Sequence, residues 1–310
     1  MQYSPLINAV RSYNLALCRQ LVLNGADVNE QVTLGVTALH MACMVPAEEG
    51  IMEFLLSNNA NPEIENVQES TPLMVACRVF SFANAELLLK YGANIDHADS
   101  KGHTVLFHAV RNGNPHNLVK YLCANGANAN VVDTAGETPL LFACRESDAR
   151  SASILLEHGA NANYVTTGSQ FSSPILFSIS INALELMRLL LAHGANLLHE
   201  NSTGENAFFL ACHLNRTTLV HILCTEVAGL DINMRQTDAR GFTALHVAAL
   251  HNSLDVARVL LELECDVWAK SKTTGTEYPV TAYEVAQMHN HDAMANLIDS
   301  FLNPPTTRLY

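Results

Sequence analysis

The sequence has little positive charge, no long apolar run and no signal-like start. Its 17 Lys and Arg stand against 30 Asp and Glu, which gives a formal net charge of −13 at pH 7. Such a field repels phosphate backbones and anionic lipid surfaces, so we expect neither nucleic acid nor a membrane to be the main partner. No apolar run approaches the roughly 18 residues that cross a bilayer, and residues 1–5 show no basic segment leading into an apolar one. We therefore expect the chain in the cytoplasm or the nucleus.

The motifs of metal sites and of catalysis are also absent. The nearest two of the eight cysteines, Cys212 and Cys224, are 12 positions apart, so the close-paired spacing of zinc sites is missing. No H-E-x-x-H, G-x-S-x-G, G-x-G-x-x-G or P-loop pattern occurs. We therefore expect no catalytic residue, no cofactor, no metal and no disulfide, and we do not expect the chain to be an enzyme.

The sequence contains instead one short segment that is repeated along its length. Residues 70–77, Ser-Thr-Pro-Leu-Met-Val-Ala-Cys, recur at 36–43 as Val-Thr-Ala-Leu-His-Met-Ala-Cys. Further clear copies begin at His103, Thr138 and Thr243, and weaker copies begin at Ser4, Ser173, Asn206 and Thr281. The third position of each copy recurs after 33 to 38 residues, and a period of this length indicates stacked structural repeats.

Each repeat has the pattern of two short helices joined by turns. A Thr or Ser such as Thr71 caps the first helix through its side-chain oxygen, and the Pro that follows fits the first helical position. A leucine-rich second helix follows, and a glycine such as Gly92 ends it in a left-handed turn. Small residues in the first helix let the next repeat approach closely. Four cysteines occupy such positions and are expected to be buried in a reducing compartment: Cys43, Cys77, Cys144 and Cys212.

This Thr-Pro-Leu-His-x-Ala core at a period near 33 resembles the ankyrin repeat, and the resemblance covers residues 4–302. It implies an all-α ankyrin-repeat solenoid of stacked helix-turn-helix units with short β-hairpin or finger loops. His40 and His246 occupy the His position of the family, which implies hydrogen bonds to neighbouring backbone. We predict one array over residues 1–303 and a C-terminal tail over residues 304–310. Its nine repeats are predicted at 2–34, 35–68, 69–101, 102–135, 136–170, 171–203, 204–240, 241–278 and 279–303.

The resemblance also implies a binding surface for a partner protein, built from the finger tips and the exposed ends of the first helices. Arg78, Arg111 and Arg145 occupy equivalent positions in three consecutive repeats, where they would form a basic stripe on an acidic chain. One interpretation is a groove for an acidic or phosphorylated segment, in which arginine forks pair with carboxylates or phosphates. The alternative is that each arginine pairs with a local acid such as Glu146.

Other candidate residues lie beside this stripe or where the repeat pattern breaks. Trp268, the only tryptophan, precedes an irregular loop, where it either forms an exposed contact or packs beneath the loop. Glu264 stands where other repeats have Gly, and a left-handed glutamate is strained, so this turn is expected to differ in shape. The protein-binding candidates are Met44, Arg78, Val79, Phe80, Lys101, Arg111, Asn112, Thr134, Arg145, His213 and Trp268.

Two asparagines are candidates for hydroxylation. Residues 21–29 and 223–233 loosely resemble the acidic-x-Asn hairpin that asparaginyl hydroxylases accept in ankyrin proteins. This resemblance would place the modification on Asn29 and Asn233. It would describe what is done to the protein rather than what the protein does.

These features favour a monomeric protein-interaction module or scaffold that holds a partner protein in its concave groove and finger loops. Two alternatives stay open. In the first, the chain is the recognition or regulatory arm of a larger enzyme, channel or signalling protein. In the second, it is the substrate adaptor of a ubiquitin ligase. An adaptor of that kind needs a docking module, and only residues 303–310 follow the last expected helix.

Overall fold

The computed structural model describes residues 4–45, 50–110, 116–166, 173–236, 240–272 and 278–303. Within these ranges the chain forms eighteen α-helices and one 3-10 helix, η1 (Thr33–Gly35), and no β-strand longer than an isolated bridge. None of the described helices is both long and apolar enough to cross a membrane. The chain divides into two compact units, Met1–Asn161 and Ala162–Tyr310. The all-α architecture predicted from the sequence is confirmed.

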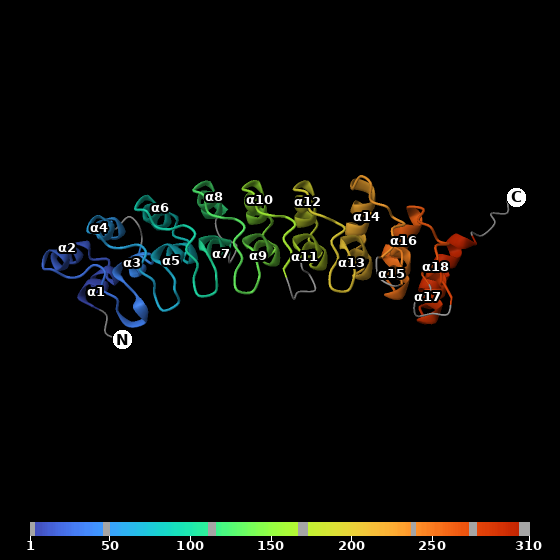
Figure 1. Cartoon of the computed structure of the whole chain (residues 1–310), viewed down its shortest axis with the longest axis horizontal. Coiled ribbons are helices and arrows are strands. Elements are labelled where there is room, and N and C mark those ends of the chain that lie inside the picture. The colour runs from blue at the N-terminus through green and yellow to red at the C-terminus, as the bar shows by residue number, and fades with distance from the viewer. Residues whose placement is uncertain are drawn as a thin grey trace. The chain divides into compact units, whose positions relative to one another are not determined.

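The α-helices follow one another in pairs along the chain (Figure 1). The first unit contains α1 (Pro5–Arg11), α2 (Leu15–Leu23), α3 (Ala38–Ala42), α4 (Ile51–Ser57), α5 (Pro72–Arg78), α6 (Phe82–Lys90), α7 (Val105–Val110), α8 (His116–Ala124), α9 (Pro139–Arg145) and α10 (Ala149–Glu157). The second unit contains α11 (Pro174–Ser180), α12 (Leu184–Ala192), α13 (Ala207–His213), α14 (Thr217–Glu226), α15 (Ala244–Leu250), α16 (Leu254–Glu262), α17 (Ala282–Met288) and α18 (Asp292–Leu302).

Within each unit the first helices of successive pairs pack against one another, and so do the second helices. In the first unit α3 contacts α1 and α5, while α4 contacts α2 and α6. In the second unit α15 contacts α13 and α17, while α16 contacts α14 and α18. Each pair therefore buries its apolar faces against its neighbours, because one helix pair alone is too small to bury them.

Helix α5 shows how the repeated segment forms its helix. The side chain of Thr71 accepts a hydrogen bond from the Met74 N–H at 3.5 Å, and Pro72 occupies the first turn, where its missing N–H costs nothing. Every side chain from Pro72 to Cys77 is buried, because the helix packs against α3, α6 and α7. The cysteines predicted to lie in the core are all buried: Cys43, Cys77, Cys144 and Cys212.

His40 and His246 tie one helix pair to the next, as predicted. Nδ1 of His40 lies 2.9 Å from the Thr37 hydroxyl, and its Nε2 lies 3.0 Å from the backbone oxygen of Ser70. His246 repeats this arrangement, with its Nε2 3.0 Å from the backbone oxygen of Val280. Burial lowers the pKa of both imidazoles below 6.5. Each ring is therefore neutral at pH 7 and donates one N–H to the neighbouring backbone.

The turn at Glu264 has the shape of the glycine turns, so the expectation that it differs was wrong. Glu264 takes a φ of 59°, and Gly92 takes a φ of 83°. The N–H of Cys265 donates to the oxygen of Leu260 at 3.1 Å, which is the bond that closes the glycine-ended helices as well. These hydrogen bonds hold a glutamate in the left-handed region in spite of the backbone strain.

The loops between pairs form fingers, and in the finger at residues 99–103 an aspartate fixes the conformation. Oδ1 of Asp99 accepts hydrogen bonds from the backbone N–H groups of Lys101 at 2.9 Å and His103 at 3.0 Å. Gly102 completes the turn with a φ of 76°. The carbonyl of Lys101 accepts a hydrogen bond from the N–H of Thr134 at 2.9 Å. The finger is thus shaped by local side-chain to backbone bonds and joined to the next finger.

Gly102→Ala is expected to destabilise the first unit more than Gly92→Ala. Both glycines have a positive φ, where alanine costs about 1–2 kcal/mol. A Cβ on Gly102 would lie 3.0 Å from Cα of Asp133 and 3.1 Å from N of Thr134, whereas a Cβ on Gly92 meets no atom within 4 Å. Backbone of the next finger must then move, so we expect a further loss of about 1–3 kcal/mol. Urea unfolding measures the difference, and equal losses in the two variants would contradict the contact.

Candidate functional site

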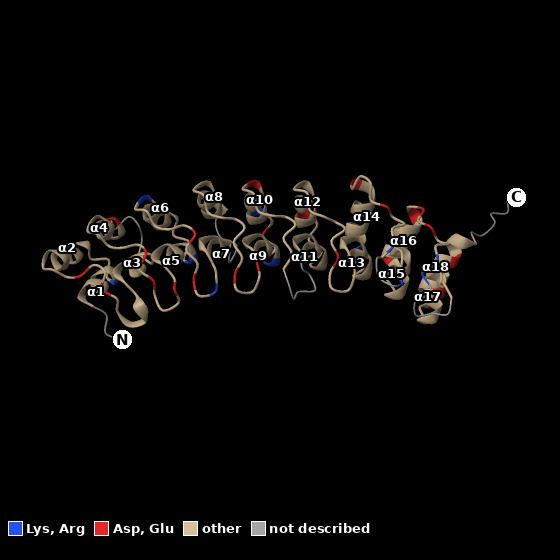
Figure 2. Ribbon diagram, viewed as in Figure 1, with Lys and Arg blue, Asp and Glu red and all other residues tan. Residues whose placement is uncertain are grey.

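The exposed side of the fingers in the first unit carries two adjoining hollows. The first has a volume of about 240 Å³ and is lined by Gln68, Ser70, Arg78, Asp99, Ser100, Lys101, His103 and His108. The second has a volume of about 310 Å³ and is lined by Lys101, His103, Phe107, His108, Asp133, Ala135, Glu137, Phe142, Arg145 and Glu146. Three residues line both hollows, so we treat the two as one surface, the finger face. Figure 2 shows acidic and basic residues interleaved along the loops beneath α5, α7 and α9.

Arg145 is held by acids close to it in the sequence. Its Nη1 lies 2.6 Å from both carboxylate oxygens of Glu137, and its Nε lies 4.0 Å from a carboxylate oxygen of Glu146. The guanidinium also lies over Phe142, 4.5 Å from the ring centroid. The alternative interpretation, in which the arginine pairs with local acids, therefore describes Arg145. The sequence suggested Glu146 as the partner, but Glu137 lies closer to the guanidinium.

Arg78 is exposed and makes no hydrogen bond or ion pair within the part of the chain that the structure describes. It ends α5 and lines the first hollow together with Lys101, which is exposed on the finger. Arg111 and Asn112 lie outside the described residues. Of the expected stripe, the described surface therefore offers Arg78 as an unpaired cation with Lys101 beside it.

The remaining candidates of the first unit differ in exposure. Met44 and Val79 are both exposed, Met44 to 56 %. Phe80 is half-buried in the turn between α5 and α6, where its φ is 62°. Thr134 is exposed, and its backbone N–H is used by the carbonyl of Lys101. Met44, Val79 and Thr134 are therefore available for contact, whereas Phe80 mainly shapes its turn.

In the second unit, His213 and Trp268 lie in different surroundings. Nδ1 of His213 is 2.9 Å from Oε1 of Glu205, and its ring stacks on His251 with the centroids 3.8 Å apart. His213 is thus half-buried and already has partners. Trp268 is 69 % exposed, so the interpretation that it packs beneath the loop is wrong. Its indole offers exposed contact area to another protein.

Sequence reasoning missed a cluster of histidines and carboxylates on the finger face. Nε2 of His108 lies 3.2 Å from Oδ2 of Asp99, and Nε2 of His103 lies 3.3 Å from Oδ2 of Asp133. The two imidazoles meet edge to face with their centroids 5.9 Å apart. Burial outweighs the effect of the Asp99 carboxylate and lowers the pKa of His108 to about 4. The signal in the sequence was a pair of histidines at positions where the other copies of the repeat have none.

Asn29 and Asn233 belong to a hydrogen-bonded ladder between neighbouring helix pairs. Oδ1 of Asn29 accepts from the Asn61 N–H at 2.7 Å, and its Nδ2 donates to the oxygen of Asn59 at 3.1 Å. Oδ1 of Asn233 accepts from the Asp266 N–H at 2.7 Å. Both side chains therefore have a structural role, and their hydroxylation stays a prediction.

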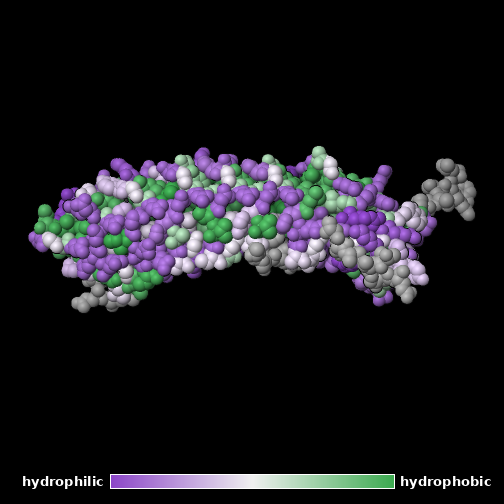
Figure 3. Space-filling model, viewed as in Figure 1, coloured by the Kyte–Doolittle hydropathy of each residue, from purple (hydrophilic) through white to green (hydrophobic). Residues whose placement is uncertain are grey.

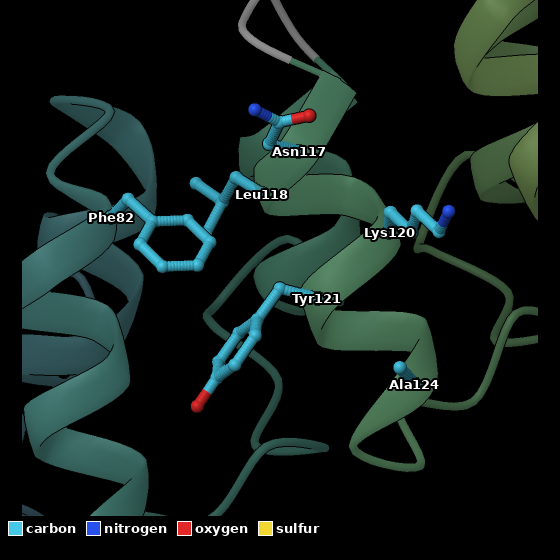
Figure 4. A pocket seen from close by; sticks show the side chains of 6 residues that line it. All are labelled: Phe82, Asn117, Leu118, Lys120, Tyr121 and Ala124. Carbon is cyan, nitrogen blue, oxygen red and sulfur yellow. The ribbon is translucent and has the colours of Figure 1, made fainter.

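A third hollow, of about 500 Å³, lies on the second helices α6 and α8. Its mostly apolar lining consists of Phe82, Asn117, Leu118, Lys120, Tyr121 and Ala124. Figure 4 shows the rings of Phe82 and Tyr121 side by side, and their centroids are 4.9 Å apart. This hollow offers contact area, but among its lining residues only one charged group, Lys120, is present to orient a ligand.

The visible face of the first unit has no uniform polarity. Figure 3 shows hydrophobic and hydrophilic residues intermixed over it.

Comparison with known proteins matches most of the chain. A family model described as ankyrin repeats (3 copies) matches residues 6–99, 84–166 and 173–271. The putative palmitoyltransferase ZDHHC13 of Danio rerio is 27% identical over 219 residues, which cover 70% of this chain and 34% of that protein. Inversin of Canis lupus familiaris is 31% identical over 250 residues, which cover 80% of this chain and 22% of inversin. The crystal structure of the human ASB11 ankyrin repeat domain matches with a TM-score of 0.56 and 29% identity, over 67% of this chain and 92% of that domain.

Proposed function

Because the chain belongs to the ankyrin-repeat family, whose repeats are protein-interaction modules, we propose that it binds a partner protein through the finger face of its first unit. The observation that carries this proposal is the guanidinium of Arg78, which is unpaired among the described residues and shares a hollow with Lys101. A partner with an acidic or phosphorylated segment supplies the carboxylates or phosphates that such groups bind. Fork-shaped pairing with Arg78 then fixes the orientation of the segment.

The surroundings of Arg78 support an anionic ligand at this end of the finger face. Asp99, the acid that lines the same hollow, uses both of its oxygens within the chain. Its Oδ1 accepts from two backbone N–H groups of the finger, and its Oδ2 lies 3.2 Å from Nε2 of His108. Asp99 therefore leaves Arg78 unneutralised, in contrast to Glu137, which pairs with Arg145 at 2.6 Å.

The charge-reversed variant Arg78→Glu/Lys101→Glu tests this site. Its matched control is Lys90→Glu/Arg150→Glu, which changes the net charge equally on α6 and α10. Circular dichroism first establishes that both variants fold as the unaltered chain does. Affinity capture from cell lysate and mass spectrometry then compare the three proteins. Two charge-assisted contacts contribute about 1.5–3 kcal/mol each, so we expect a partner that the control retains and the variant loses by about 10-fold or more. Equal recovery by all three proteins would contradict the proposed site.

We also propose that the chain acts as the recognition arm of a larger protein. The supporting observation is the length of its relatives, since the match covers 34% of ZDHHC13 and 22% of inversin. An immunoblot of source cells with an antibody against this chain tests the proposal. A band well above 33.8 kDa is expected, and a single band at that mass would count against it.

We further propose that the chain is monomeric and works in the cytoplasm or the nucleus. All eight cysteines are free, and seven of them are buried. Free thiols suit a reducing compartment. A disulfide-linked form isolated from the native source would contradict this location.

A further inference from the structure

Three side chains of the finger face bring metal-ligand atoms close together. A carboxylate oxygen of Asp99 and one ring nitrogen each of His103 and His108 all lie within 4.8 Å of one another. Oδ2 of Asp99 and Nε2 of His108 are 3.2 Å apart. Two ligands bound at about 2.0 Å to one tetrahedral ion are separated by roughly 3.3 Å. We propose that Asp99, His103 and His108 bind a divalent cation of the zinc class.

Backbone and carboxylate groups hold these ligands in place. Because Oδ1 of Asp99 accepts hydrogen bonds from the backbone N–H groups of Lys101 and His103, its Oδ2 stays turned toward His108. Oδ2 of Asp133 lies 3.3 Å from Nε2 of His103. The other oxygen of Asp133 is fixed by backbone N–H groups at 2.9 and 2.8 Å. A carboxylate beside a ligating histidine is the usual outer support of a metal site, because it orients the ring and raises its basicity.

The cluster is largely shielded from water, and its rings are suitably oriented. The side chains of His108 and Asp99 are exposed to 7 % and 8 %, and that of His103 to 19 %. The planes of the two imidazoles stand at 81° to each other. Lone pairs lie in the ring plane, so rings at this angle are able to direct them to one point.

A second group, in the other unit, lacks this orientation. Ligand atoms of Glu205, His213 and His251 also lie within 4.8 Å of one another. The two imidazoles are stacked, however, with 22° between their planes and 3.8 Å between their centroids. Their lone pairs therefore run side by side rather than converging, which makes this group a comparison for the finger-face site.

The charges around the cluster are mixed: the positive charge of Arg78 opposes a cation there, and the carboxylate of Asp133 beside His103 favours one. The two hollows are lined by four carboxylates and three basic side chains: Asp99, Asp133, Glu137 and Glu146, and Arg78, Lys101 and Arg145. A mixed set of imidazole nitrogen and carboxylate oxygen suits zinc and related ions. Three protein ligands leave a further coordination position open toward the hollow. The site does not rest on the proposed function, since it requires no partner protein.

Isothermal titration of the untagged, chelator-treated chain with ZnCl₂ tests the site. We expect one tight site for each chain. Its affinity is expected to fall more than about 100-fold in His108→Ala, beyond the 10–100-fold that outer-shell changes cause, and by about 10-fold or more in Asp133→Asn. His213→Ala, in the comparison group, is expected to leave the affinity unchanged.

His103→Ala keeps the test decisive if the loss of His108 disturbs folding, because the His103 side chain is the more exposed of the two. Circular dichroism and the unfolding temperature establish that each variant is folded. The absence of zinc uptake by the unaltered chain would overturn the proposal. Uptake that survives both His103→Ala and Asp99→Asn, or that is abolished by His213→Ala, would overturn it as well.

Discussion

Replacing Phe208 with alanine is expected to lower the free energy of unfolding of the second unit by about 3–5 kcal/mol. Phe208 and its neighbour Phe209 are fully buried in α13, with their ring centroids 6.0 Å apart. Helix α13 packs against α11, α14 and α15, so removal of the ring leaves a cavity enclosed by helices on several sides. Urea unfolding followed by circular dichroism measures the loss.

Phe301→Ala is the matched control for this change, because it removes the same ring from the same unit. Phe301 lies in α18 and is 43 % exposed. Its removal leaves little cavity, so we expect a loss of less than about 1 kcal/mol. Similar losses in the two variants would contradict the packing described for α13.

Replacing His246 with alanine is expected to destabilise the second unit by about 2–4 kcal/mol. Nδ1 of the buried ring lies 2.7 Å from the Thr243 hydroxyl, and Nε2 lies 3.0 Å from the backbone oxygen of Val280. Loss of the ring removes one of the two hydrogen bonds to that oxygen, which also accepts from the Ser271 N–H at 2.8 Å, and leaves the Thr243 hydroxyl without its ring partner. Each lost hydrogen bond costs about 0.5–1.5 kcal/mol, and buried packing is lost as well. His193→Ala is the control, because His193 is exposed and its ring bonds, among the described residues, only to the backbone oxygen of Leu189 in the preceding helix. Thermal unfolding compares them, and equal effects would contradict the linking role of His246.

The same histidine makes the second unit sensitive to acid. Burial lowers the pKa of His246 below 6.5, so the folded chain holds the ring neutral. The unfolded chain takes up a proton as the pH falls below about 6.5, so it binds more protons than the folded chain there and stability declines. Keeping the His246 ring neutral therefore costs the folded chain nothing above about pH 6.5, and the free energy of unfolding falls progressively as the pH drops below that value. We expect the unfolding temperature to drop between about pH 7 and pH 5, and to drop less in His246→Ala. An identical drop in both proteins would contradict the neutral ring.

The fold was predictable from the sequence because each copy of the repeat carries its own folding signals. Thr71 and Pro72 start α5, Cys77 lies in its core, and Gly92 ends the following helix in a left-handed turn. These effects act over a few residues, so a pattern in the sequence suffices to identify them. The same reasoning failed at Glu264, because closing hydrogen bonds from neighbouring backbone outweigh the residue's own preference.

The functional surface was predictable only in part, because its contacts join residues from a finger and the helix that follows. Arg145 pairs with Glu137, eight positions earlier, and His108 meets Asp99, nine positions earlier. In both pairs the acid lies in the finger before the helix that carries its partner, so no helical or strand periodicity relates the two residues. The exposure of the Trp268 side chain was also not predictable from a periodic pattern, because a local turn determines it. The backbone N–H of Trp268 bonds to Asp266 at 3.0 Å, and the resulting turn leaves the indole exposed.

Photo-crosslinking from matched single positions is the most direct test of binding at the finger face. A benzophenone amino acid replaces Ala135, which lines the second finger-face hollow, or Ala124, which lines the hollow on α8. Both residues are exposed alanines of the first unit, and neither carries the charge that the proposed site requires. Binding at the finger face predicts a crosslinked partner from position 135 and little or none from position 124. A partner crosslinked from position 124 and not from position 135 would contradict it.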